Sequence, residues 1–420
     1  MARKIEFGIK GMDEFDYREK TVLLRLDINS PIHPVTKKII SENRIDMSIP
    51  TIQYLLDQKA KVVIIAHQGD TLDYENLIPM GEHAEKLSQK LAIAVRYIDD
   101  VAGPAAQESI KSLKFGEAIL LGNLRYLAEE ISTFENAVKL EPHQMLNTYL
   151  IRNIAPLVDC YVNDAFSAAH RNAPSMVAFE ELLPTAGGLL MMKELSALTK
   201  VMECPNKPSV FVLGGAKISD AFAMMKQVLE NGTADKILAS GVTGNIMLMA
   251  SGYSIGKINE KFIKDRSLDV FVKPAKEYLA KYPGKIIFPS DLAYEKNGKR
   301  IEIAIENLPI EESLLDIGSK TIKVFVSEIK KGGTIFVNGP AGVYEKEIFE
   351  NGTKEIWKAI AKASGYSVIG GGDTVSAAQK FIDLSDISYV CTAGGAMVQF
   401  LSGKKMPLIK AMKKAFKKEF

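Results

Sequence analysis

The chain has 420 residues, more than one hydrophobic core usually holds together, so we expect two domains. Hydrophobic residues make up 47% of it and charged residues 25%, which is typical of an ordinary globular protein. With 53 basic and 51 acidic side chains it lacks the broad positive charge that favours nucleic acid as a partner, although small local clusters could still bind phosphate.

Three widely separated cysteines, Cys160, Cys204 and Cys391, indicate neither a disulfide framework nor a zinc site. The N-terminal sequence has no apolar signal core, and no window approaches the roughly 20 apolar residues that a membrane span needs. We therefore expect a soluble, cytoplasmic protein that acts without a membrane and without an obligate protein partner.

Short apolar runs alternate with helical patterns along the first half of the chain. The runs at 21–28, 61–67, 118–123 and 160–165 are typical of buried parallel strands. After Asn43, apolar residues recur at helical spacing from Ile45 to Leu56, which predicts a helix with one buried face.

This rhythm pauses at residues 182–208, where glycines and prolines bracket a helical stretch, so we place the domain boundary there. Strand-like runs resume at 208–215, 235–241, 284–291, 333–340, 366–372 and 387–395. The predicted fold class is α/β, with two doubly wound, Rossmann-like domains built on parallel sheets. The basic C-terminal segment predicts a solvated helix, with a membrane-surface helix as the alternative.

Polar side chains follow the predicted strands of the first half, where ligands of open parallel sheets bind. They are Arg25, Asp27, Asn29, His67, Asn123, Arg125, Asn163, Asp164, His170 and Arg171, with Arg44 at the start of the first helix. Together they favour a small anion that carries carboxylate and phosphate. A single strand-end arginine would more simply be a surface charge, but the recurrence argues against that alternative.

Glycine-rich turns follow the strands of the second half instead, at 213–217, 240–244, 337–342, 370–374 and 392–396. Glycines followed by a helix start bring backbone amides close to a polyphosphate, so we expect a nucleotide there. Asp373 is a candidate magnesium ligand or a simple helix cap, and Lys217 is a candidate phosphate ligand or a surface lysine. Walker A, GxGxxG, protein-kinase, HExxH and GxSxG signatures are absent from the sequence.

Eight motifs, in order along nearly the whole chain, resemble the phosphoglycerate kinase family. They are RLDINSP, NRI (43–45), GNLRY, YVNDAFSAAHR, LGGAK, DIG (316–318), VNGPAGVYEKEIFENGT and VIGGGDT. The resemblance implies a magnesium-dependent kinase of glycolysis and gluconeogenesis that uses ATP or ADP with 3-phosphoglycerate or 1,3-bisphosphoglycerate. It also implies a phosphoglycerate domain (1–185), a hinge helix (186–201), a nucleotide domain (202–400) and a C-terminal helix (401–420) that packs back on the first domain.

The resemblance also assigns residues to the two half-sites. Implied phosphoglycerate ligands are Asp27, Asn29, Arg44, His67, Arg125 and Arg171. Implied nucleotide ligands are Gly214, Gly215, Lys217, Gly241, Asn338, Pro340, Glu345, Gly371, Gly372, Asp373 and Thr374. Glu345 would bind the ribose and Asp373 the Mg²⁺. Arg44, Lys217 and Gly372 would be catalytic.

Three positions depart from the family pattern: Asp70 stands where an arginine is usual, Ala221 where a second lysine is common, and Ser30 where valine is usual. The first two leave open a nucleotide-binding regulatory protein that has lost turnover. A sugar or acetate kinase of another fold is a weaker alternative. For an active enzyme we expect in-line attack by the substrate carboxylate on the γ-phosphorus, with hinge closure to exclude water.

Overall fold

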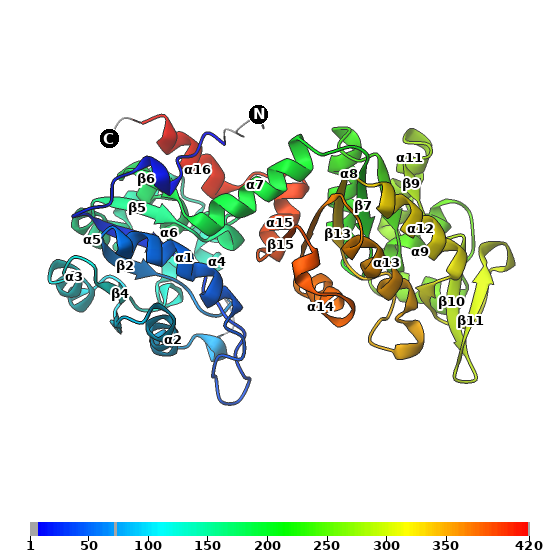
Figure 1. Ribbon diagram of the computed structural model, residues 1–420, viewed down its shortest axis with the longest axis horizontal. Helices are drawn as coiled ribbons and strands as arrows, with labels where there is room; N and C mark the ends of the chain where they lie inside the picture. The colour runs from blue at the N-terminus through cyan, green and yellow to red at the C-terminus, as the bar shows by residue number, and fades with distance from the viewer. Residues whose placement is uncertain (1–6, 71–73, 419–420) are drawn as a thin grey trace. The chain divides into compact units, whose positions relative to one another are not determined.

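A computed structural model describes residues 7–70 and 74–418 (Figure 1). Contacts divide it into one unit of residues 1–196 and 405–420 and another of residues 197–404. The division falls within helix α7 (Leu189–Glu203), which runs from the first unit into the second. The outermost residues of the predicted first and last segments, 1–6 and 419–420, lie outside the described residues.

The first unit is built on a six-stranded parallel sheet in the order β3-β4-β2-β1-β5-β6. Its strands are β1 (Thr21–Arg25), β2 (Lys61–Ile65), β3 (Val95–Tyr97), β4 (Ala118–Leu120), β5 (Cys160–Asn163) and β6 (Thr185–Gly187). Each predicted run contains one strand; β1 and β5 end on the polar residues Arg25 and Asn163, and β2 and β4 end before His67 and Asn123. The sequence did not predict β3 and β6, because neither is an apolar run: β3 (Val-Arg-Tyr) has the exposed Arg96 at its centre, and β6 (Thr-Ala-Gly) has no large apolar side chain.

Helices flank this sheet (Figure 1). They are α1 (Asn43–Asp57), α2 (Gly81–Leu91), α3 (Pro104–Lys111), α4 (Ser132–Val138), α5 (Tyr149–Ile154), α6 (Pro174–Val177) and α16 (Pro407–Phe416). The predicted apolar face of α1 is buried at Ile45, Ile52, Leu55 and Leu56. It packs with the central strands into one core, which fixes Arg44 at the helix start beside the carboxyl end of β1.

The second unit has its own six-stranded parallel sheet, in the order β15-β14-β13-β7-β8-β9. Its strands are β7 (Ser209–Leu213), β8 (Lys236–Ala239), β9 (Ile286–Ile287), β13 (Thr334–Asn338), β14 (Tyr366–Gly370) and β15 (Tyr389–Cys391). Its helices are α8 (Ile218–Glu230), α9 (Gly241–Ala250), α10 (Lys257–Asp265), α11 (Val272–Lys281), α12 (Ser319–Lys331), α13 (Asn351–Ala361), α14 (Gly372–Phe381) and α15 (Gly394–Leu401). The prediction of two parallel α/β domains is confirmed.

A small antiparallel sheet in the second unit was not predicted. It has the order β11-β10-β12, from β10 (Asp291–Lys296), β11 (Lys299–Ala304) and β12 (Leu314–Ile317). Asn297 and Gly298, both with positive φ, make the turn between β10 and β11, and this Asn-Gly pair is a hairpin signal that the sequence analysis overlooked. The predicted strand at 284–291 is correspondingly wrong in extent, because only Ile286–Ile287 joins the parallel sheet.

The C-terminal helix α16 packs on α6, β6 and the 3₁₀ turn Phe179–Glu181 within the first unit. Leu408, Ala411, Met412 and Ala415 form its buried face. Lys414 and Lys418 pair with Glu181 at 2.6 and 2.7 Å. The apolar face that a membrane-surface helix would need is thus covered by the protein itself. In the described parts of the chain, no helix is both long and apolar enough to span a bilayer.

Glu180, next to that ion pair, gives a testable pH dependence. Its side chain is 1% exposed, and neither carboxylate oxygen accepts a hydrogen bond from another described residue. Burial, and to a lesser extent the charge of Glu181, raises the pKa of Glu180 well above its ordinary value of 4.5. The pKa of Glu180 is higher in the folded protein than in the unfolded chain. The protonated side chain therefore contributes its full share to the free energy of unfolding below about pH 4.5, and this contribution is lost as the pH rises through the folded-state pKa.

We expect Glu180→Gln to remove this loss. Urea unfolding of parent and variant between pH 4.5 and 8 should show the parent losing stability relative to the variant by up to ~1.4 kcal/mol per pH unit. Glu181→Gln is the matched control. Burial opposes ionisation of Glu181, but the hydrogen bonds from Lys414 and Lys418 lower its pKa, so this variant should instead be most destabilised at neutral pH. Parallel curves for parent and Glu180→Gln would contradict the assignment.

Candidate functional site

Asp27 and Arg44 form an ion pair beyond the carboxyl end of β1. Nη1 of Arg44 lies 2.5 Å from Oδ2 of Asp27, and the hydroxyl of Ser167 donates to the same oxygen. Asn29 accepts a hydrogen bond at 3.0 Å from the backbone N–H of Gly69, in the loop after β2. The first strand-end loop is therefore tied both to α1 and to the loop of the neighbouring strand.

His67 is buried among cations at the end of β2. Its Nδ1 lies 3.0 Å from Nη2 of Arg25, a side chain that is only 2% exposed. Burial, followed by the charges of nearby arginines, holds the pKa of His67 well below its usual value; these arginines are Arg25, Arg125, Arg44 and Arg171. His67 is thus neutral, and because a guanidinium can only donate, its proton sits on Nε2, available as a hydrogen-bond donor.

Buried side-chain nitrogens nearby lack partners. In the part of the chain that the structure describes, Nε of Arg125, Nη2 of Arg171 and Nδ1 of His170 make no hydrogen bond. Burial and the charges of Arg171 and Arg25 lower the pKa of Arg125 to about 10. Buried polar groups without partners are rare, and mutually repelling cations are stabilised by an anion. This cluster is therefore suited to a small, multiply charged anion.

Other strand-end residues have structural roles instead. Asn123 accepts hydrogen bonds from the backbone N–H groups of Gln68 and Arg125. Asp164 accepts from the Thr51 hydroxyl and, at 2.8 Å, from the backbone N–H of Met191 in the first turn of α7. Burial raises the pKa of Asp164 to about 6. These side chains fix the loops and the start of α7.

Sequence reasoning missed Glu135 in the first unit. Its Oε2 lies 2.7 Å from Nε of Arg171, and its Oε1 accepts from the backbone N–H of Asn172. This carboxylate orients the guanidinium and leaves Nη2 without a partner. No signal pointed to it, because Glu135 lies in the short helix α4, away from the strand ends.

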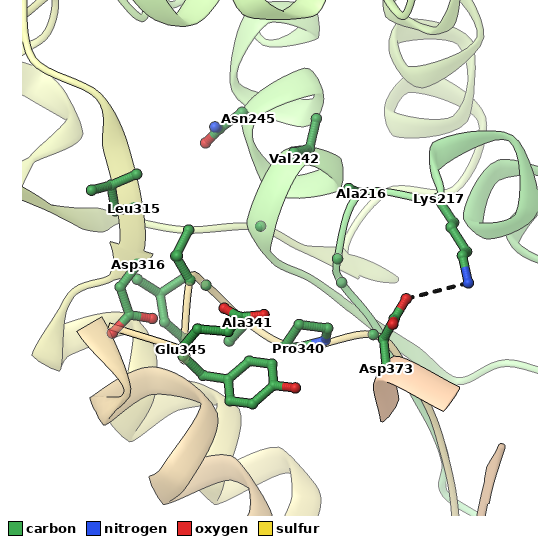
Figure 2. A pocket seen from close by; sticks show the side chains of 18 of the residues that line it. Ala216, Lys217, Val242, Asn245, Leu315, Asp316, Pro340, Ala341, Glu345 and Asp373 are labelled. Atoms are coloured by element: carbon green, nitrogen blue, oxygen red, sulfur yellow. Dashed lines mark ion pairs between the residues drawn. The ribbon is translucent and has the colours of Figure 1, made fainter. Parts of the chain in front are cut away.

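In the second unit, a cavity of about 600 Å³ lies beside the loops that follow β7, β13 and β14 (Figure 2). It brings together all the predicted nucleotide residues except Gly372, which begins α14 directly after a lining residue. Those in the lining are Gly214, Gly215, Lys217, Gly241, Asn338, Pro340, Glu345, Gly371, Asp373 and Thr374. Helix α9 and strand β12 complete the walls.

Two of these glycines act differently from the prediction. The backbone N–H of Gly214 donates to Asn338 O at 2.9 Å, and that of Gly215 donates to Pro340 O at 2.8 Å. A Cβ at Gly214 would lie 2.2 Å from Pro340 O, so glycine is needed for the two loops to meet. These amides are not available to a ligand. The first-turn amides of α14, which have no intrahelical acceptor, are available.

Lys217 and Asp373 lie at one end of the cavity, with 3.2 Å between Nζ and Oδ2 (Figure 2). Both side chains are largely exposed and so can turn toward a ligand. Within residues 7–70 and 74–418, no group of three or more His, Cys, Asp or Glu side chains is arranged to hold a metal ion. Magnesium in nucleotide sites usually takes one or two carboxylates plus phosphate oxygens and water, so Asp373 alone fits that donor set. Thr374 accepts a hydrogen bond from the N–H of Gly339 and steadies the adjacent loop.

The lining of the cavity also contains residues that were not predicted. They are Val242, Asn245, Phe262, Leu292, Leu314 and Leu315, from α9, α10, β10 and β12. Asp316, from the DIG motif, accepts hydrogen bonds from Arg300 and from the N–H of Gly352, and burial raises its pKa to about 6. Only tertiary contacts assemble this wall, because its members come from four separate elements.

The three departures from the family pattern have distinct settings. Ala221, whose methyl side chain carries no charge, is fully buried on α8 and faces the core. Asp70 is exposed, and its charge acts on Arg125, whose pKa it raises against the larger effect of burial. Ser30 is buried, with its N–H bonded to Gln68 and its hydroxyl to Ile28 O, so it serves the loop structure.

Comparison with known proteins gives a consistent result. The family model described as phosphoglycerate kinase matches residues 12–404. Phosphoglycerate kinase from Methanothermus fervidus is 42% identical over 412 residues, covering 98% of each chain. The Pyrococcus furiosus enzyme is 39% identical, covering 96% of this chain and 97% of its own.

Solved structures agree with the sequence relatives. Phosphoglycerate kinase from Pyrococcus horikoshii OT3 superposes with a TM-score of 0.85 at 37% identity, covering 98% of this chain and all of its own. The structure from Coxiella burnetii gives a TM-score of 0.82 at 33% identity, covering 97% and 99% of the two chains. The resemblance of the ordered motifs is thus confirmed, and the chain belongs to the phosphoglycerate kinase family.

Proposed function

We propose that this chain reversibly transfers a phosphoryl group between ATP and the carboxylate of 3-phosphoglycerate, giving ADP and 1,3-bisphosphoglycerate, as a step of glycolysis and gluconeogenesis in the cytoplasm. Family membership establishes the enzyme class, a kinase. The observation that carries the substrate assignment is the pair of buried guanidinium donors without partners, Nε of Arg125 and Nη2 of Arg171. We include no nucleic acid, membrane or obligate protein partner in the proposal.

In the first unit, we assign substrate binding to Asp27, Asn29, His67, Arg125 and Arg171. The free nitrogens of the two arginines suit the substrate phosphate and carboxylate, since guanidinium groups bind both in forked geometry. Neutral His67 offers a donor without adding a further charge. Arg44, only one-third exposed and oriented by Asp27, is assigned to the phosphoryl group in transfer.

In the second unit, we assign the polyphosphate to the glycine loops and to Lys217, and the ribose to Glu345. The first-turn amides of α14, including Gly372, would face phosphate oxygens with the positive end of the helix dipole. Asp373 would hold Mg²⁺, which when bound neutralises part of the polyphosphate charge. The other assigned nucleotide ligands are Gly241, Asn338, Pro340, Gly371 and Thr374, while Gly214 and Gly215 line the cavity with their N–H groups bonded to Asn338 O and Pro340 O.

Catalysis would then depend on position and charge. The attacking carboxylate is already ionised near neutral pH, so it needs no general base. Lys217, Arg44 and the amide of Gly372 would neutralise the charge that spreads over the equatorial oxygens during in-line transfer. Each half-site belongs to a different unit. Turnover would therefore require a closure that lets both half-sites contact the two bound substrates at once and that excludes water.

A coupled assay tests this function directly. With 3-phosphoglycerate, MgATP and a reductive trap for the acyl phosphate, we expect turnover that depends on both substrates. A protein that binds MgADP but shows no turnover would instead support a nucleotide-binding protein that has lost activity through Asp70 and Ala221.

Asp373→Asn should lower kcat/KM for MgATP steeply, by roughly 10 to 10²-fold, because an amide keeps the shape but loses the charge that attracts the metal. Rates measured across a magnesium series check this, with Asp386→Asn, at an exposed position outside the cavity, as the matched control. If turnover of Asp373→Asn at saturating magnesium stayed within twofold of the parent, the metal assignment would be wrong.

A further inference from the structure

Gln68 is a buried amide in the loop after β2, directly following the proposed substrate ligand His67. Its side chain is only 2% exposed. Nε2 of Gln68 donates to Ser30 O, and Oε1 accepts from the backbone N–H of Ser30, both at 2.9 Å. Because both bonds are made to the main chain, they determine which way round the amide lies. One side chain thus ties the loop after β1 to the loop after β2.

His83, on α2, holds the same amide from another element. Its side chain is fully buried, and its Nε2 lies 3.0 Å from Oε1 of Gln68. Because an amide oxygen can only accept, Nε2 of His83 is the nitrogen that carries a proton. Burial lowers the pKa of His83 to about 4, so the ring is neutral near pH 7. Oε1 of Gln68 therefore accepts two hydrogen bonds, which uses both of its lone pairs.

The main chain of Gln68 is bonded to a third loop. Its N–H donates to Oδ1 of Asn123 and its carbonyl accepts from Nδ2 of Asn123, at 3.1 and 3.0 Å. The same Oδ1 accepts from the N–H of Arg125, and the N–H that follows Gln68 in the chain donates to Asn29. Gln68 therefore lies where the loops after β1, β2 and β4 meet. These loops carry three of the proposed substrate ligands, Asn29, His67 and Arg125.

We propose that Gln68 and His83 are positioning residues for the binding of 3-phosphoglycerate. Oε1 and Nε2 of Gln68 both face protein groups, so the amide acts through the loops and does not touch the substrate. Gln68 sets the spacing of the three ligand-bearing loops, and His83 keeps its amide in place. This inference rests on the proposed function, because it uses the assignment of those ligands to the substrate.

Gln68→Met tests the role, because methionine is similar in length to glutamine but makes neither bond to Ser30. We expect the KM for 3-phosphoglycerate to rise by roughly 10-fold, since small displacements of groups that bind a substrate are costly. The KM for MgATP should stay within about twofold of the parent, because the nucleotide cavity is lined by the other unit. Asp27 keeps its bonds to Arg44 and Ser167, so kcat should stay within about threefold.

Two variants of His83 keep the inference testable if Gln68→Met folds poorly. His83→Leu removes one donor to Oε1 of Gln68 but leaves both bonds to Ser30, so the KM for 3-phosphoglycerate should rise by only about threefold. His83→Gln can donate again from a side chain of similar reach, and it should return this KM close to the parent value. A rescue of this kind is expected of a hydrogen bond that positions a loop, and not of packing alone.

Gln58→Met is the matched control. Oε1 of Gln58 also accepts a backbone N–H, that of Tyr17 at 3.1 Å, but Gln58 precedes β2 and so lies at the opposite edge of the sheet. This variant should lower stability in urea unfolding while leaving both KM values unchanged. An unchanged KM for 3-phosphoglycerate in Gln68→Met and His83→Leu would overturn the inference, even if kcat fell, because loss of folded enzyme lowers kcat alone. Absence of turnover in the parent would instead overturn the proposed function.

Discussion

Lys217→Ala is expected to lower kcat by about 10² to 10³-fold, the loss typical of removing one preorganised donor from a developing charge. Among the residues that the structure describes, Lys217 and Lys346 are the only cationic ones in the lining of the second-unit cavity. Lys217 lies at the start of α8, and its ammonium is 3.2 Å from the carboxylate of Asp373. The ammonium therefore needs only a small movement to reach a phosphate bound beside that carboxylate. Lys346 pairs loosely with Glu295, at 3.9 Å.

Little local compensation is expected. The position one turn further along α8 is Ala221, which faces the core and is fully buried. Steady-state kinetics with both substrates check the prediction, and Lys226→Ala, which removes an exposed lysine from the same helix, is the matched control. A loss of less than tenfold in Lys217→Ala would show that another cation, with Lys346 the first to examine, neutralises the transferring group.

The central strands could be predicted because each is an apolar run ending in polar or glycine residues. Buried parallel strands require such runs, since both faces of the sheet are covered. The antiparallel sheet of β10, β11 and β12 could not be found in this way, because β11 is largely exposed and its alternation is weak. The Asn297-Gly298 turn was the one local signal for it. Edge strands β3 and β6 lack an apolar run, since β3 has the exposed Arg96 at its centre and β6 is Thr-Ala-Gly, so they depend on their neighbours rather than on their own pattern.

The candidate site also has residues that could be predicted from the sequence and residues that could not. Strand-end chemistry pointed to His67, Arg125 and Asp373, because topology alone brings the ends of parallel strands to one edge. It could not show that Gly214 serves loop packing, since that depends on the loop after β13. Nor could it find Glu135, whose relevance comes from its contacts with Arg171 and Asn172 on a distant part of the chain. The sequence locates the edge at which chemistry occurs, while tertiary packing decides which groups there remain free for a ligand.

Arg44→Ala should reduce turnover of 3-phosphoglycerate by roughly 10³-fold while leaving the Kd for MgADP within twofold of the parent. The large effect is expected because an arginine that neutralises a transferring phosphoryl group acts mainly in the transition state. The nucleotide cavity is lined entirely by residues of the second unit, whereas Arg44 belongs to the first. Binding of the nucleotide and catalysis should therefore separate in this variant.

Two further variants sharpen the Arg44 result. In the parent, the guanidinium of Arg44 lies 2.5 Å from Asp27. Arg44→Lys keeps a positive charge there but loses the planar fork of the guanidinium, so we expect its activity to lie between those of the parent and the alanine variant. Arg96→Ala removes an exposed arginine from β3 and should change neither quantity. Calorimetry and steady-state kinetics on the same preparations decide the matter. A tenfold loss of MgADP affinity with kcat preserved would place Arg44 on the nucleotide side, because a transition-state contact lowers kcat and leaves ground-state nucleotide affinity unchanged.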